Sequence, residues 1–185
     1  RSEPQGTKYK TFSSKGLGRE VSYLVYLPPQ YEEQSQRYPV IYWLHGMNGT
    51  QRTGGEVFVP YLDAAIRQRL LPPCIAVLPN GMVSGFYRDA AGGELPVESV
   101  IIKDLIPHVD QTYRTLAERN GRVIQGYSMG GYGAAHLGFK YPELFGTVIV
   151  DAGALDPKRF NKVLDNAEHP GQWVEKNVDK VRNQM

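Results

Sequence analysis

The chain has little of what several classes of protein depend on. Its 185 residues contain a single cysteine, Cys74, which excludes an internal disulfide framework and a metal site built from cysteines. The four histidines form neither an H-x-H nor an H-E-x-x-H pair, so we expect no bound metal. No apolar run approaches the roughly 20 residues that a helix needs to cross a bilayer, so we expect no membrane segment.

An excess of charge of one sign is also missing. The sequence has 21 basic and 19 acidic residues, a formal net charge of +2, and no run of lysine or arginine. This balance argues against nucleic acid or a membrane surface as a partner. With 41% hydrophobic residues, the chain is long enough to bury a core of its own. We therefore expect one globular domain over residues 1–185, with no cofactor.

Strand-like and helix-like segments alternate along the chain, which is typical of an α/β fold. Five segments have the pattern of strands: residues 19–31, 38–46, 74–81, 121–128 and 146–153. Three have helical spacing: residues 54–71, residues 97–115 with a kink near Pro107, and residues 130–142. Because helices separate the last four strands, we expect a mostly parallel sheet with helices on both faces. In such a sheet the functional site lies beyond the carboxyl ends of the strands.

The segment Gly126-Tyr127-Ser128-Met129-Gly130 has the pattern G-x-S-x-G at a junction of strand and helix. A serine hydroxyl is a weak nucleophile that needs sharp presentation, a base and a site for an oxyanion. A tight elbow flanked by small residues gives the presentation. The helix start directs the Met129 N–H toward the same place. The pattern predicts Ser128 as nucleophile and Met129 as an oxyanion donor; the alternative is a glycine-rich turn with an idle serine.

A second glycine-rich turn, His45-Gly46-Met47-Asn48-Gly49, follows another expected strand. An oxyanion hole needs a second amide from a neighbouring strand end, and we predict the Met47 N–H as that donor. For His45 we weigh two roles, a catalytic base and a brace that hydrogen-bonds the turn, and we favour the brace.

These motifs resemble the esterase D-like family of α/β-hydrolases. That family includes feruloyl and acetyl-xylan esterases, S-formylglutathione hydrolases and mycolyltransferases of the antigen 85 type. The likeness rests on YLVYLPPQY, YPVIYWLHGMNG, GYSMGGYGAAHLGFKYPELF and VDAGALD. It extends over nearly the whole chain, from about Tyr9 to Trp173. It implies an α/β-hydrolase fold, Ser128 as the nucleophile, and Met47 and Met129 as the oxyanion donors.

The resemblance also implies two more strands after residues 146–153, the first followed by a catalytic acid and the second by a histidine. We therefore expect residues 1–185 to be an incomplete hydrolase domain that lacks the last strands. Within the chain, Asp151 and His169 follow Ser128 in the order acid, then histidine, that these hydrolases use. An internal triad of these residues is one interpretation. In the other, Asp151 caps a turn and His169 is an exposed loop histidine.

The predicted activity is hydrolysis of short-chain or aryl esters, of feruloyl or acetyl type, through an acyl-enzyme on Ser128. The expected binding partner of the protein is a small-molecule ester substrate. Acyl transfer to an alcohol and hydrolysis of S-formylglutathione are alternatives that use the same site. Because the acid and histidine that the resemblance implies are missing, a further alternative is an inactive fragment or binding module.

We also expect the uncovered sheet edge near residues 146–153 to form a homodimer. The start at Arg1 and the resemblance favour a secreted or periplasmic location.

For some other residues we weigh more than one role. Tyr87 and Arg88 either line the cleft or belong to a solvated loop with an Arg88–Asp89 pair on the surface. His136 lies two turns along the helix after Ser128 and is expected to be a packing or surface residue. Trp173 is either a lid, part of an acyl pocket, or an anchor that packs the tail.

Overall fold

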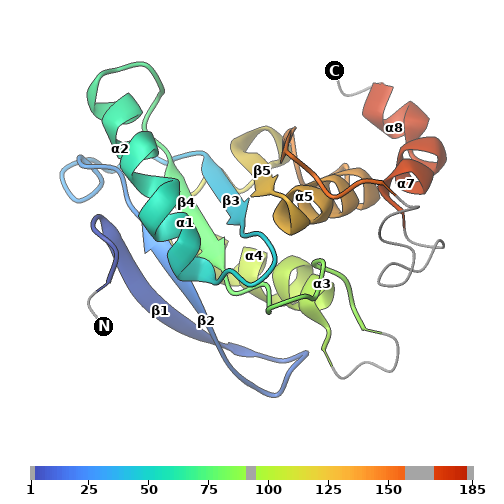
Figure 1. Cartoon of the computed structure of the whole chain (residues 1–185). Helices are drawn as coiled ribbons and strands as arrows, with labels where there is room; N and C mark the ends of the chain where they lie inside the picture. The colour runs from blue at the N-terminus through green and yellow to red at the C-terminus, as the bar shows by residue number, and fades with distance from the viewer. Residues whose placement is uncertain (1–2, 91–94, 157–168, 183–185) are drawn as a thin grey trace.

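A computed structural model of the chain describes residues 3–90, 95–156 and 169–182, and a six-stranded sheet forms its centre (Figure 1). The strands are β1 (Thr7–Ser14), β2 (Arg19–Tyr26), β3 (Val40–Leu44), β4 (Ile75–Pro79), β5 (Arg122–Tyr127) and β6 (Thr147–Asp151). Their order across the sheet is β1-β2-β4-β3-β5-β6. Hence β3, the strand before the His45 turn, lies beside β5, the strand before Ser128.

The four strands from β3 to β6 run parallel, as the alternation of strands and helices predicted. The expectation of five strands was wrong by one, because β1 precedes them and pairs antiparallel with β2. β1 lies at the edge of the sheet and its side chains are mostly exposed. Phe12 is its one buried hydrophobic residue. A strand of this kind has almost no apolar alternation to reveal it.

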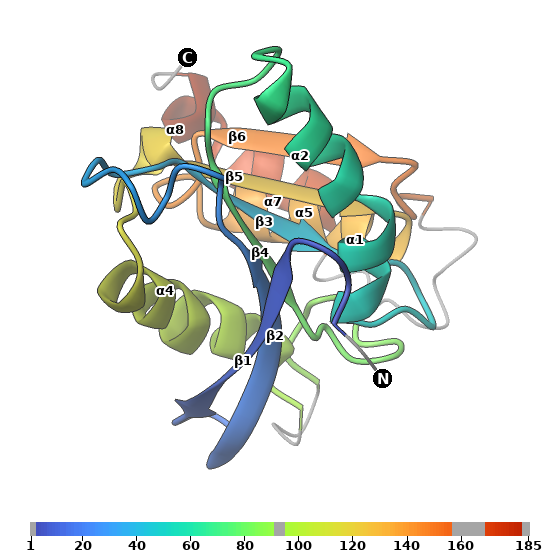
Figure 2. The ribbon, with the colours of Figure 1, turned by 90° about the vertical axis from the view of Figure 1, so that its left-hand side faces the viewer.

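Helices cover both faces of the sheet (Figure 2). On one face, α1 (Gln51–Val57) and α2 (Val59–Arg67) pack over a core that includes Tyr26 and Trp43. On the other face lie η1 (Val100–Leu105), α4 (Ile106–Thr112) and α5 (Met129–Lys140), over a larger core that includes Tyr23 and Tyr42. The short elements α3 (Val97–Ser99), η2 (Arg119–Gly121), α7 (Pro170–Lys176) and α8 (Val178–Arg182) complete the fold.

Prolines shape two of the expected helices. The helix predicted over residues 54–71 is divided at Phe58 into α1 and α2, with Pro60 in the first turn of α2. The kink expected near Pro107 is a π-helical stretch, η1, in which the Ile106 N–H donates to the Ile101 carbonyl five residues back. A proline nitrogen has no hydrogen to donate to the carbonyl four residues earlier, so the α-helical ladder is interrupted there. Within the described residues, no helix has both the length and the apolar character for a bilayer span.

Candidate active site

Ser128 occupies a strained turn between β5 and α5. Its φ is 54° and its ψ is −114°, a region that residues other than glycine rarely adopt. Strain of this kind costs on the order of 1–3 kcal/mol and persists only where the surroundings hold it. Here the Ser128 N–H donates to the Asp151 carbonyl at 2.9 Å, and the Ser128 carbonyl accepts from the Tyr132 and Ala154 N–H groups. The turn that the motif predicted is therefore present and fixed by its neighbours.

The flanking glycines allow this turn because no side chain fits at their positions. A Cβ on Gly126 would stand 2.0 Å from the Gly130 carbonyl oxygen. A Cβ on Gly130 would stand 2.0 Å from the Leu44 carbonyl oxygen at the end of β3. Both contacts are to backbone atoms, which cannot swing aside as a flexible side chain can. The two outer positions of the G-x-S-x-G pattern are thus steric requirements of the elbow.

The His45–Gly49 turn lies directly beside the elbow. A Cβ on Gly46 would stand 3.5 Å from the Cβ of Ser128. The turn is closed by the Gly49 N–H, which donates to the Gly46 carbonyl at 3.0 Å, and by the Asn48 N–H, which donates to the Val83 carbonyl at 3.0 Å. The Met47 N–H donates to none of the described residues. A donor to an oxyanion needs such an unoccupied N–H, and that role for Met47 stays a prediction.

Met129 is the first residue of α5, and its side chain is buried in the larger core. An N–H in the first turn of a helix has no acceptor within that helix. The positive end of the helix dipole adds to the attraction for a negative charge. The structure thus brings the Gly46–Met47 turn and the start of α5 together at Ser128. Their part in stabilising an oxyanion stays a prediction.

His45 is fully buried and both of its ring nitrogens are occupied. Its Nδ1–H donates to the Gly46 carbonyl at 2.8 Å, and its Nε2 accepts from the Gly81 N–H at 3.0 Å. Burial lowers the pKa of His45, and the hydrogen bond to Gly46 offsets this only in part. A neutral histidine held in this way braces the turn, the role that the sequence favoured over that of a base.

Asp151 and His169 do not form a triad with Ser128 among the described residues. Asp151 ends β6, its side chain is exposed, and its backbone carbonyl is the group that contacts Ser128. His169 caps α7: its Nδ1 accepts from the Gly171 N–H at 3.1 Å, and its Nε2–H donates to the Leu155 carbonyl at 2.9 Å. The catalytic base and acid therefore stay predictions that these contacts do not support.

The loop after β4 is packed more deeply than the sequence indicated. Tyr87 was expected to line a cleft or to lie in a solvated loop, but its side chain is fully buried and its hydroxyl donates to the His45 carbonyl at 3.0 Å. Asp89 accepts hydrogen bonds from the backbone N–H and the hydroxyl of Ser99. Glycine-rich sequence usually indicates an exposed loop, but here Gly81 of the loop and Gly133 of α5 make room for the Tyr87 ring.

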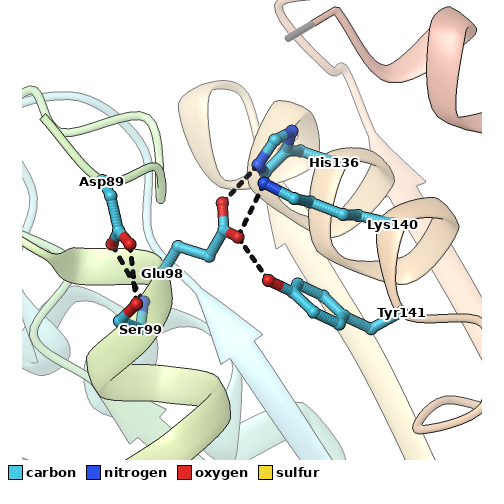
Figure 3. A network of polar contacts seen from close by, with 6 residues as sticks. All are labelled: Asp89, Glu98, Ser99, His136, Lys140 and Tyr141. Carbon is cyan, nitrogen blue, oxygen red and sulfur yellow. Dashed lines mark hydrogen bonds and ion pairs between the residues drawn. The ribbon is translucent and has the colours of Figure 1, made fainter. Parts of the chain in front are cut away.

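A buried polar network, which the sequence did not reveal, fastens α3 to α5 (Figure 3). His136 Nε2 lies 2.7 Å from Glu98 Oε2, and Lys140 Nζ lies 2.8 Å from Glu98 Oε1. The Tyr141 hydroxyl also donates to Glu98 Oε1. Burial raises the pKa of Glu98, but the hydrogen bonds from His136, Lys140 and Tyr141 outweigh it and hold the pKa at about 2. Glu98 is therefore a buried anion at neutral pH.

His136 is thus a packing residue, as expected, although its Nε2 also contacts the Glu98 carboxylate. Trp173 of α7 meets the His136 ring edge-on, with ring centroids 6.1 Å apart. The ammonium groups of Lys140 and Lys176 lie 4.7 and 4.6 Å from the centre of the Trp173 ring. Of the three roles weighed for Trp173, these contacts favour an anchor that packs α7 against α5.

A cavity of about 170 Å³ lies at the end of β4, between the β1–β2 hairpin and η1. Apolar side chains such as Phe12, Met82 and Val100 line most of it. It is at the same edge of the sheet as Ser128, and two strand spacings, roughly 10 Å, separate β4 from β5. Among the residues that the structure describes, no three His, Cys, Asp or Glu side chains gather into a metal site.

Comparison with known sequences gives consistent matches. The model of the family named Esterase, described as "Putative esterase", matches residues 14–184. An esterase of Mycobacterium tuberculosis is 30% identical over 154 residues, which are 82% of this chain and 33% of the relative. An endo-1,4-beta-xylanase/feruloyl esterase of Xylanibacter ruminicola is 32% identical over 145 residues, which are 74% of this chain and 20% of the relative. The chain thus spans a third or less of the length of these relatives.

Comparison with solved structures shows the fold. A ferulic acid esterase superposes with a TM-score of 0.81 at 24% identity, covering 96% of this chain and 74% of the other. An S-formylglutathione hydrolase of Agrobacterium tumefaciens superposes with a TM-score of 0.74 at 23% identity, covering 95% and 73%. These likenesses confirm the α/β-hydrolase fold that the motifs predicted.

Proposed function

Because the chain belongs to the Esterase family, we propose that it is a serine esterase that acts through an acyl-enzyme on Ser128. The match to this family confirms the resemblance that the motifs indicated. The acyl-enzyme mechanism on Ser128 is a proposal that the family match alone does not give. One observation carries the proposal: Ser128 lies in a strained elbow with the Gly46–Met47 turn against it. Such strain is kept at functional sites more often than elsewhere.

The chemistry follows from this geometry. The Ser128 hydroxyl oxygen attacks the ester carbonyl carbon while its proton passes to a base, giving a tetrahedral intermediate. The Met47 and Met129 N–H groups donate to the oxygen that becomes negative. Collapse of the intermediate expels the alcohol and leaves an acyl group on Ser128, and water then releases the carboxylic acid.

The base is the open part of this proposal. His169 is the histidine that follows Ser128 and Asp151 in hydrolase order, yet its nitrogens are engaged by Leu155 and Gly171. Within this chain, His169 would have to release both contacts before accepting the Ser128 proton. A histidine from outside residues 1–185 would perform the same step without that rearrangement.

The substrate that we propose is a small carboxylic ester with a short-chain or aryl acyl group. The names of the relatives include a feruloyl esterase and a ferulic acid esterase, which support the aryl class. The cavity at the end of β4, at about 170 Å³, is comparable to cavities that hold a benzene ring. Acyl transfer to an alcohol would use the same serine, and product analysis separates the two reactions.

Fluorophosphonate labelling tests the proposal directly, with hydrolysis of 4-nitrophenyl acetate and methyl ferulate as a second readout. We expect the label on Ser128, located by mass spectrometry, and none on Ser128→Ala. The matched control is Ser84→Ala, which removes an exposed hydroxyl from the neighbouring loop and should leave labelling intact. Unchanged labelling in Ser128→Ala would place the reactive group at another residue and overturn the proposal. No labelling of the unmodified chain would oppose a nucleophilic role for Ser128 within residues 1–185 and favour an inactive fragment or binding module.

A further inference from the structure

Tyr87 connects the loop after β4 to the turn that carries Met47. Its hydroxyl donates to the His45 carbonyl at 3.0 Å, and its side chain has no exposed surface. The His45 carbonyl belongs to the peptide unit that enters the Gly46–Met47 turn. A hydrogen bond at that oxygen therefore restrains the orientation of the turn itself, in the interior of the protein.

The Tyr87 ring is enclosed by backbone on two sides. A Cβ on Gly81 would stand 2.2 Å from the Tyr87 Cε1, and a Cβ on Gly133 would stand 2.4 Å from the Tyr87 Cδ2. Gly81 begins the loop after β4, and Gly133 lies in α5. The ring thus fills a slot between this loop and the helix that Ser128 begins, and it has no room to change its position.

The backbone at this point is strained. Phe86 has a φ of 48° and Tyr87 a φ of 56°, two successive aromatic residues in the left-handed region. For a bulky side chain such a conformation is unusual and unfavourable. Strain persists where surrounding contacts over-determine it. Here it turns the Tyr87 side chain inward, to the His45 carbonyl.

The same carbonyl also meets α5. A Cβ on Gly130 would stand 2.8 Å from the His45 carbonyl oxygen. Gly130 directly follows Met129, and His45 precedes Met47 by two residues. The Tyr87 hydroxyl therefore binds where the Met47 turn and the start of α5 come together.

We infer that Tyr87 is a positioning residue that holds the Met47 N–H in register with the Met129 N–H. The inference rests on the proposed function of the Ser128 site. Donors of this kind act when they are aimed at the place that the oxyanion will occupy, so a small displacement of the turn weakens them. The Tyr87 ring itself touches neither substrate nor Ser128 in this role.

Tyr87→Phe tests the inference because it removes the hydroxyl and keeps the ring in its slot. Hydrogen exchange of the Asn48 and Gly49 N–H groups reports on the turn, since these groups donate to Val83 and Gly46. We expect both to exchange roughly tenfold faster in Tyr87→Phe, while the amides of α5 keep their wild-type rates. This readout needs no catalytic activity.

Tyr38→Phe is the matched control. Tyr38 is 1% exposed, lies at the other end of β3, and its hydroxyl has no hydrogen-bond partner among the described residues. Wild-type exchange is expected for the Asn48 and Gly49 amides in this variant. Tyr87→Phe showing the same exchange as Tyr38→Phe would overturn the inference. A uniform acceleration across α5 and β5 would also overturn it, because it would make Tyr87 an ordinary packing residue.

Kinetics add the catalytic readout. We expect kcat for an ester substrate to fall about tenfold in Tyr87→Phe with KM nearly unchanged, since the displaced donor acts on the transition state. A rise in KM alone would contradict this. If the unmodified chain neither hydrolyses esters nor reacts with fluorophosphonate, the proposed function fails, while the exchange of the turn still decides the role of Tyr87.

Discussion

The Cα of Gly126 faces the carbonyl oxygen of Gly130 so closely that a Cβ there would stand 2.0 Å away. In Gly126→Ala the elbow must open, because neither backbone can move without disturbing β5 or α5. Overpacking of this kind costs about 1–3 kcal/mol, and we expect urea unfolding to show a loss of this size or larger. Labelling at Ser128 should be lost as well.

Gly16→Ala is the control for that variant. A Cβ at Gly16 would have its nearest neighbour, an oxygen of Asp104, at 3.4 Å, so the change should be tolerated. Wild-type labelling by Gly126→Ala would show that the tight elbow is not needed for reactivity.

Replacing the buried anion should release α3 from α5. In Glu98→Gln, Lys140 loses its anionic partner and His136 loses a charged hydrogen-bond partner, and breaking a buried ion pair costs about 3–5 kcal/mol. We expect the free energy of unfolding to fall by an amount near the lower end of this range, because glutamine keeps the shape of the side chain and one oxygen acceptor. Glu143→Gln, an exposed change nearby, should alter the free energy of unfolding by less than about 0.5 kcal/mol. Equal effects of the two variants would contradict a structural role for the network.

The same carboxylate predicts how stability depends on pH. The native pKa of Glu98 is about 2, against 4.5 as the reference. In the unfolded chain this group therefore takes up a proton first as the pH falls. Its stabilising contribution is complete above pH 4.5 and is lost between about pH 4.5 and 2, and it is on the order of 3 kcal/mol. When the free energy of unfolding of Glu98→Gln is measured against pH, we expect no loss from this group between about pH 4.5 and 2. If the variant loses as much stability over that range as the unmodified chain, another group is responsible for the acid dependence.

The edge strand β6 leads us to propose a homodimer. Ile149 and Val150 are 40% and 37% exposed, and on the side away from β5 no described strand pairs with β6. Open edges pair with other chains, and a lysine blocks such pairing. We expect sedimentation to show dimers that Ile149→Lys dissociates. Tyr61→Lys, on an exposed site of α2, should not dissociate them. A monomer at all concentrations would rule the dimer out.

Filling the cavity at the end of β4 tests the aryl part of the proposed substrate. Val100 lines the cavity and is 5% exposed. We expect Val100→Phe to lower kcat/KM for methyl ferulate by roughly tenfold, with little change for 4-nitrophenyl acetate, because one ring then occupies the space of another. Val57→Phe, at an exposed position, serves as control. An equal loss of kcat/KM on both esters would show that the cavity does not bind the aryl group of the substrate.

The sequence predicted those parts of the fold that have strong local patterns. The strands at β3 and β4 are short apolar runs, and the elbow is a motif whose glycines have a direct steric cause. β1 escaped prediction because an exposed edge strand has little apolar alternation. The Glu98–His136 pair joins residues 38 positions apart, and no local pattern connects them. Tyr87 was placed in the wrong environment because its burial depends on glycines in two separate elements.

The strand order also affects synthesis of the chain. β3 lies between β4 and β5, and β5 is the last of the three to be made. Roughly 80 residues separate β3 from β5, which at 5–20 residues per second is about 4–16 s of translation. During that interval the side of β3 that will pair with β5 has no strand beside it. Until Arg122–Tyr127 leaves the ribosome, this open side of β3 can pair with strands of other chains.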